Sequence, residues 1–80
     1  MSDAPIKDFT RKKELIEQAL PQLCAAENPF FKSLEYSLNL HNGVVQAEVV
    51  TLQFHGKTVT LDVSKMSVAQ IAITVLQRVA

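Results

Sequence analysis

Two short turn motifs, Asn-Gly at residues 42–43 and His-Gly at 55–56, constrain the fold of this chain more than any other feature. Asn-Gly is the dipeptide that best tolerates the positive φ angles of a two-residue hairpin turn. Before it, residues 34–41 alternate between apolar and polar side chains, which is typical of a strand with one buried face. Further strands are predicted over 44–54 and 57–63. The chain is therefore expected to form a three-stranded antiparallel meander.

The two turns predict opposite facings for the middle strand. With a two-residue first turn, paired residue numbers sum to 85, so Tyr36 lies opposite Val49 and the odd-numbered side of the middle strand points inward. With a two-residue second turn the sum is 111, so Leu52 lies opposite Val59 and the even-numbered side points inward. Both facings cannot hold in one regular strand that has one buried side.

Three arrangements would resolve the conflict. A β-bulge near residues 49–50 would add one residue to the middle strand and reverse its facing. Alternatively, the second turn is a longer loop, and strand 57–63 shifts its register. In the third arrangement both sides of the middle strand are covered, by helices on one side and by another protein chain on the other. That last arrangement would have a direct functional meaning.

A first helix is predicted from Asp8 or Thr10 onward, with charged and amide side chains on one side. Its apolar residues recur at helical spacing and are Phe9, Leu15, Ile16, Ala19, Leu20 and Leu23. Pro21 removes an amide that would bond to the preceding turn. The helix is therefore expected either to stop near Leu20 or to restart at Pro21 and continue to about Ala26.

A second helix is predicted near the C-terminal end, because Ser67 and Gln70 have the spacing of a capping box. The order of elements is then α-β-β-β-α. We expect an α+β fold in which two helices pack on one face of the three-stranded antiparallel meander. Residues 1–7 are expected to form a flexible N-terminus, and residues 8–80 a single domain.

The composition is that of a compact globular domain, with 48% hydrophobic and 20% charged residues among 80. Eight basic and eight acidic residues cancel, so no overall field would attract a nucleic acid or an anionic membrane. The apolar stretches are too short or too interrupted for a signal peptide or a membrane span. A single cysteine excludes an intrachain disulfide. We expect a cytoplasmic protein without membrane contact.

The residues that commonly carry catalysis or bind metals are few and scattered. His41 and His55 flank turns at opposite ends of the middle strand, too far apart to share a site within one chain. Cys24 lies among apolar neighbours on the first helix, which favours a buried structural thiol over a nucleophile. The two glycines cannot build a phosphate-binding loop. We therefore expect neither an enzyme nor a metal or cofactor.

The last helix is apolar over an unusually wide arc. Ala69, Ile73 and Ala80 extend its core stripe, so one sheet layer is not expected to cover it. Together with the two-sided middle strand, this favours a small protein-interaction or assembly module that binds itself as a homodimer or binds another protein. The expected contact residues are Val50, Leu52, Phe54 and Ile73, with Phe30 and Phe31 as further candidates.

The second hypothesis is a nucleic-acid-binding domain that uses the basic cluster Arg11, Lys12 and Lys13 together with Lys65. The order α-β-β-β-α, and the sequence SKMSVAQIAI at the start of the last helix, resemble double-stranded-RNA-binding domains. Lys65 stands where that family has a basic cluster. The resemblance implies contact with duplex RNA. A third hypothesis is a subunit that folds fully only within a larger assembly.

Overall fold

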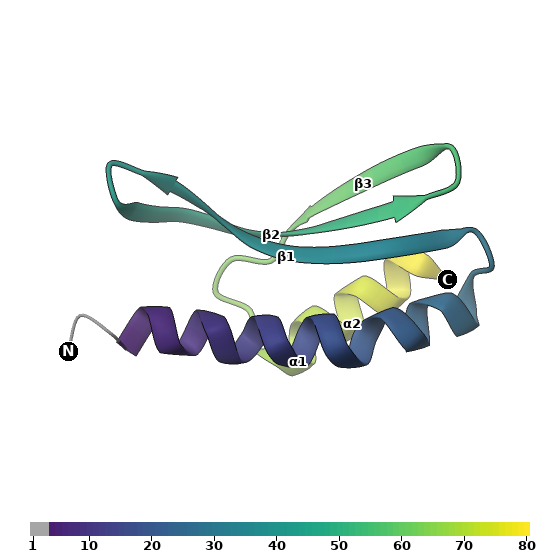
Figure 1. Cartoon of the computed structure of the whole chain (residues 1–80), viewed down its shortest axis with the longest axis horizontal. Coiled ribbons are helices and arrows are strands. Elements are labelled where there is room, and N and C mark those ends of the chain that lie inside the picture. Colours follow the sequence, from purple (N-terminus) through teal and green to yellow (C-terminus); the bar gives the residue numbers. More distant parts are fainter. Residues whose placement is uncertain (1–3) are drawn as a thin grey trace.

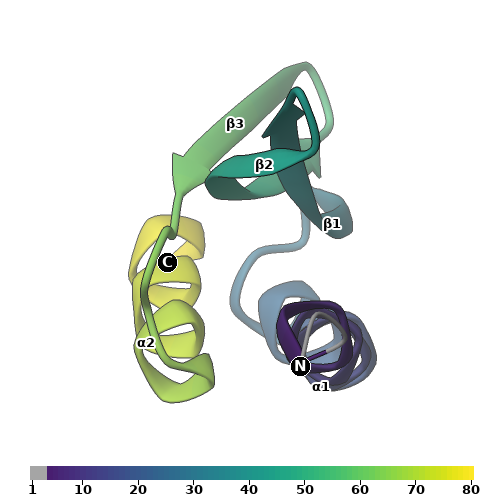
Figure 2. The same cartoon turned by 90° about the vertical axis from the view of Figure 1, so that its left-hand side faces the viewer.

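The computed structural model describes the backbone of residues 4–80 and the side chains of residues 9–80. Its elements follow the predicted order and are α1 (Ala4–Glu27), β1 (Phe31–His41), β2 (Val44–Phe54), β3 (Lys57–Asp62) and α2 (Val68–Val79). The strands form one antiparallel sheet in the order β1-β2-β3. Both helices lie side by side on one face of this sheet (Figures 1 and 2). The predicted α+β fold is thereby confirmed.

A β-bulge resolves the conflict in β2, but it lies closer to the first turn than predicted. Val45 pairs with Leu40, whereas Ala47 pairs with Asn39, so Gln46 is the extra residue. The pairs on the turn side of Gln46 sum to 85, and those beyond it sum to 86. One extra residue reverses which side of a strand faces the core. The facing of β2 therefore changes at Gln46 and not at residues 49–50.

The rest of β2 has its even-numbered side toward the helices. Tyr36 pairs with Val50, so the predicted pairing with Val49 is wrong. Leu52 pairs with Val59, as the second turn predicts. The alternative of a longer second loop is not needed, because β2 and β3 keep one regular register.

A second bulge lies at the start of β1, which begins three residues before the predicted strand. Lys32 is unpaired between the pairs that Phe31 and Ser33 make with β2. This reversal brings Phe31 to the same side as Phe54, and their rings meet edge to face at 6.0 Å. The bulge thus extends the core toward the end of β1.

The core is a single cluster between the sheet and the helix pair. Its buried members are Ile16, Leu20, Cys24, Leu34, Tyr36, Val50, Leu52, Phe54, Val63, Ile71, Val75 and Val79. Each helix contributes three of these residues, spaced four apart, which places them on one helical face. Only one face of each helix is therefore needed to close the core.

Helix α1 is longer than predicted at both ends. It begins at Ala4 instead of Asp8 or Thr10, and it passes through Pro21 without stopping. The residues on either side of Pro21 in the core stripe, Leu20 and Cys24, are both buried, and this packing holds the helix together across the missing hydrogen bond. Of the expected flexible N-terminus, residues 1–3 lie outside the described part and the rest are helical.

The ends of both helices are closed by polar contacts. Asn28 leaves α1 and donates from its side chain to the carbonyl of Val79 at 3.1 Å, which ties the C-terminal ends of the two helices together. The predicted capping box of α2 is confirmed. The Ser67 hydroxyl accepts from the amide of Gln70 at 3.2 Å, and the Gln70 side chain accepts from the amide of Ser67 at 2.9 Å.

Candidate protein interface

Three of the expected contact residues belong to the core of the single chain. Val50 and Leu52 have no exposed surface, and Phe54 is 6% exposed. The bulge at Gln46 is the reason, because it turns the even-numbered side of β2 toward the helices of the same chain. These side chains cannot meet a partner unless the fold opens, which corrects the expectation that they form a contact surface.

The other expected contact residues differ in exposure. Ile73 is 57% exposed and lies on the side of α2 opposite its buried stripe, so it points away from the sheet. Phe30 is 63% exposed in the connection between α1 and β1. Phe31 is half-buried against Phe54. Ile73 and Phe30 are therefore the two predicted contact residues that a partner can reach.

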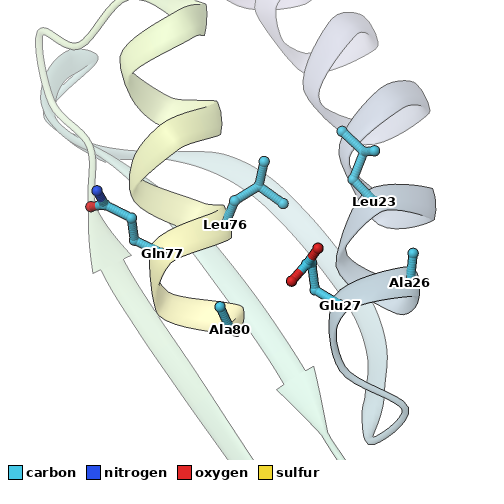
Figure 3. Close-up of a pocket in the computed structure, with 6 residues that line it drawn as sticks. All are labelled: Leu23, Ala26, Glu27, Leu76, Gln77 and Ala80. Carbon is cyan, nitrogen blue, oxygen red and sulfur yellow. The ribbon is translucent and has the colours of Figure 1, made fainter.

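An apolar groove lies between the C-terminal ends of the two helices (Figure 3). Its volume is about 310 Å³. Leu23, Ala26 and Glu27 line it from α1, and Leu76, Gln77 and Ala80 line it from α2. Leu23 is 50% exposed although it lies beside this groove. The two helices thus leave apolar side chains uncovered on the side remote from the sheet.

The groove is part of a longer apolar surface along both helices, here called the outer helix surface. It consists of Leu15, Ala19, Leu23 and Ala26 on α1 and of Ala69, Ile73, Leu76 and Ala80 on α2. All but Leu76 are exposed, and Leu15 is 48% exposed. Spacings of three and four residues place each set along one face of its helix. This surface is where a single chain offers most apolar contact area on its helices.

The rim of the outer helix surface is nearly neutral. Its exposed polar neighbours on α1 are Gln18 and Gln22, and those on α2 are Gln70 and Gln77. Amide side chains bind other proteins by hydrogen bonds but do not steer a polyanion. The composition of the rim therefore favours a protein partner over a nucleic acid or a lipid headgroup.

A second group of exposed apolar residues lies at the far end of the β1–β2 hairpin, where the turn extends beyond β3 (Figure 1). Leu40, Val44 and Val45 are exposed there. β3 pairs only with residues 49–54 of β2, so this end of the hairpin is a two-stranded ribbon. It lies at the opposite end of the sheet from the β2–β3 turn.

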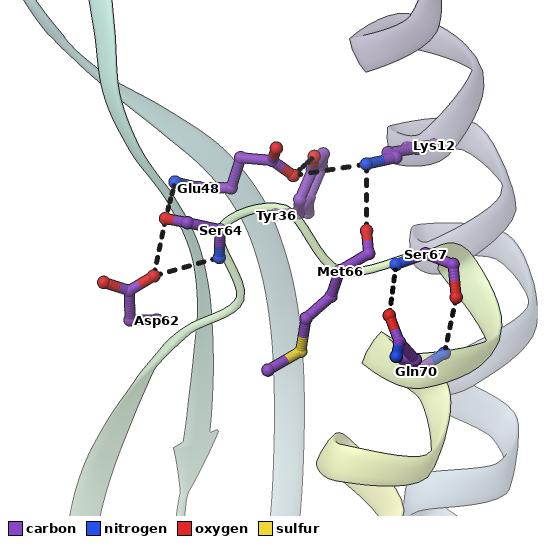
Figure 4. A network of polar contacts seen from close by, with 8 residues as sticks. All are labelled: Lys12, Tyr36, Glu48, Asp62, Ser64, Met66, Ser67 and Gln70. Atoms are coloured by element: carbon purple, nitrogen blue, oxygen red, sulfur yellow. Dashed lines mark hydrogen bonds and ion pairs between the residues drawn. The ribbon is translucent and has the colours of Figure 1, made fainter.

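The predicted basic cluster is divided between solvent and the interior (Figure 4). Lys12 donates to the carbonyl of Met66 at 3.0 Å and lies 3.5 Å from a carboxylate oxygen of Glu48. Lys13 donates to Glu17 at 2.7 Å and to the carbonyl of Tyr36 at 3.0 Å. Both lysines are half-buried, so they join α1 to the rest of the chain.

Arg11 and Lys65 are the exposed members of the predicted nucleic-acid contact set. Lys65 has a φ of +63° in the turn that leads into α2. Two exposed cations make a small electrostatic footprint for a nucleic-acid site. The arrangement therefore gives the basic residues a structural role first.

The Glu48 carboxylate joins three elements (Figure 4). Its Oε2 atom accepts from the Tyr36 hydroxyl at 2.6 Å and faces Lys12 of α1. Tyr36 is 1% exposed, and its ring stacks on that of Phe9 at 5.2 Å. The contact therefore connects β1, β2 and α1 at a poorly hydrated position.

We expect Tyr36→Phe to reduce the free energy of unfolding by roughly 1.5–3 kcal/mol, because a hydrogen bond to a charged group is lost while the ring stack is kept. Urea unfolding of Tyr36→Phe, Glu48→Gln and the double variant would measure this. The two single effects should exceed their sum in the double variant, since they remove one shared contact. Strict additivity would contradict the bond.

Asp62 is held in its ionised form by Ser64 (Figure 4). The side chain and the amide of Ser64 donate to Asp62 Oδ1 at 2.6 and 2.9 Å, which lowers the pKa of Asp62 from its ordinary value of 3.8. The ionised form therefore stabilises the folded state above pH 3.8, and this contribution is lost as the pH falls through the lower folded pKa.

We expect Asp62→Asn to lower the free energy of unfolding at pH 7 but to approach the wild-type value in strong acid. Urea unfolding at both pH values would check this, and an NMR titration of the Asp62 carboxyl should give a midpoint below 3.8. A difference between the two proteins that does not change with pH would contradict the role of the charge.

The titratable residues considered for catalysis lie apart. His41 and His55 are exposed at opposite ends of β2. Cys24 has no exposed surface, and burial raises the pKa of its thiol above the ordinary value. Among the described residues, no group of three or more His, Cys, Asp and Glu side chains could hold a metal ion.

Sequence reasoning missed Leu15 and Leu23 as surface residues. Both were expected in the apolar stripe of the first helix together with Ile16 and Leu20. The available signal was that the stripe is two residues wide, since Leu15, Ala19 and Leu23 run parallel to Ile16, Leu20 and Cys24. One of two parallel stripes was bound to remain outside a small core.

Comparison with known proteins places this chain in no family. No protein-family model, curated protein or solved structure matches the chain. In the described part of the chain, neither helix combines the length and the apolar character that crossing a membrane requires. The case for a function therefore depends on the surfaces described above.

Proposed function

We propose that this chain is a non-enzymatic protein-interaction or assembly module that forms a homodimer through the outer helix surface. One observation carries the proposal: Leu15, Leu23 and Ile73 are each about half exposed around an apolar groove that the chain itself does not fill. Exposed apolar area of this kind favours association in a small domain. The face differs from the one expected from sequence, since only α2 is shared.

The area available fits a dimer. A specific interface buries roughly 800 Å² on each partner. The accessible surface of the chain is 5533 Å², so an interface of that size would take about one-seventh of it. Helix α1 alone is about 36 Å long, since it has 24 residues at about 1.5 Å each. Two helices of the chain therefore offer enough length for an interface of ordinary size.

The charge distribution favours a protein partner. The net charge is zero, the rim of the outer helix surface is rich in glutamine, and Lys12 and Lys13 already contact groups within the chain. The free thiol of Cys24 is buried and fits a reducing compartment, which supports a cytoplasmic location. These features support the interaction module over the nucleic-acid alternative.

Light scattering over a concentration series would test the proposal. The wild-type chain should reach twice the mass of one chain, and Ile73→Glu should remain a folded monomer, because it buries a charge at the contact. Gln53→Glu adds the same charge on the outer face of the sheet and should dimerise like the wild type. A wild-type monomer at every concentration would overturn the proposal. Binding of duplex RNA that weakens steeply with salt would favour the alternative.

A further inference from the structure

Helix α1 carries a pattern that is symmetric about Ala19. Leu15 and Leu23 each lie four residues from Ala19, and they are 48% and 50% exposed. Arg11 and Glu27 each lie eight residues from it, are exposed and carry opposite charges. All five residues lie on one row of side chains that are four positions apart. The pattern reads the same in both directions, except that the charges exchange sign.

We propose that the second copy binds by antiparallel pairing of α1 with α1 about a two-fold axis that passes beside Ala19. Residues whose numbers sum to 38 then face each other across the axis. Leu15 of one copy meets Leu23 of the other, and Arg11 meets Glu27, each pair occurring twice. This inference depends on the proposed homodimer and specifies its geometry.

Packing geometry agrees with this pairing. Two helices whose rows of side chains four apart interdigitate cross at about −50°, at an axial separation of about 8–10 Å. The small side chain of Ala19 lies at the crossing point and allows the close approach. The same angle brings the ends of the two rows together, so that Arg11 can reach Glu27 of the second copy.

The charges select this occupant and this direction. An antiparallel pair sets each Arg11 near a Glu27, whereas a parallel pair would bring Arg11 near Arg11 and Glu27 near Glu27. Only another chain with the same spacing of charges and leucines would match every position. Ile73 on α2 lies beside the row and would cover the flank of the second copy.

A charge exchange tests the direction of pairing. Arg11→Glu and Glu27→Arg should each weaken the dimer by roughly tenfold, because each variant turns two attractive pairs into two repulsive ones. The double variant Arg11→Glu/Glu27→Arg should regain the wild-type dissociation constant. Glu14→Lys changes the charge of the same helix outside the row and should leave the rescue pattern unaffected. A double variant no better than its parents would overturn the proposal.

Cross-linking tests the position of the axis. Ala19→Cys should be joined to a dimer by a short bis-maleimide, whereas the wild type should not, since its Cys24 is buried. Lys32→Cys on β1 is exposed and serves as a control that should stay uncross-linked. A stable dimer with neither cross-link nor charge rescue would overturn this geometry and leave the proposed function standing. A monomer by light scattering would overturn both.

Discussion

Replacing Leu52 with glutamate is expected to unfold the chain, because the Leu52 side chain is completely enclosed in the core. Loss of a buried leucine to alanine alone costs roughly 2–5 kcal/mol. A buried, unpaired carboxylate adds several kcal/mol of desolvation. A domain of 80 residues has an unfolding free energy of about 4–12 kcal/mol. The combined loss should therefore exceed the stability of the fold.

Thermal unfolding followed by circular dichroism would measure this effect, with Ile73→Glu as the matched control. Ile73 is 57% exposed, so the same substitution there should leave a folded chain with a melting temperature within a few degrees of the wild type. A cooperatively folded Leu52→Glu would show that the even-numbered side of β2 is not the core side.

The alternation and the turn motifs predicted the three strands, their order and the second register. The position of the bulge could not be predicted, because residues 44–46 are all exposed. This end of the hairpin extends beyond β3, and water reaches its side chains. Where neither face is buried, the hydrophobic pattern does not select a facing. The signal needed to locate the bulge is therefore absent from Val44, Val45 and Gln46.

The roles of the basic residues depend on contacts between distant parts of the chain. Lys12 donates to a carbonyl 54 positions away, and Lys13 to one 23 positions away. Both acceptors are backbone atoms, so the identity of the acceptor residue carries no sign of the contact. A cluster of three adjacent cations therefore resembled a binding patch in the sequence, although two of its members join α1 to the other elements.

The outer helix surface was half predicted for a similar reason. Ile73 could be identified because it widens the stripe of a helix whose core face was clear. For α1, two parallel stripes had equal apolar character, and the choice between them depends on where α2 packs. The wider context of the fold, and not local propensity, decided that Leu15 and Leu23 remain outside.

Deletion of Gln46 is expected to leave the fold intact and to change the free energy of unfolding by only about 1 kcal/mol. Gln46 has no partner in β1, and its neighbours Val45 and Ala47 pair with consecutive residues of that strand. Without the bulge, the same pairs can form a regular ladder, so no core side chain changes side. Thermal unfolding and cross-strand NMR contacts between Asn39 and Ala47 would check both points.

Deletion of Val49 is the matched control, and it should abolish the folded state. Val49 lies inside the regular part of β2 and is paired on both sides. Removing it reverses the facing of every residue on one side of the gap, so either Val50 and Leu52 or the Glu48 carboxylate would leave its place. Opposite outcomes for two single deletions three residues apart would locate the change of facing at Gln46. Equal tolerance of both deletions would instead show that β2 can slide along β1, and an unfolded Gln46 deletion would show that the bulge is required for the register.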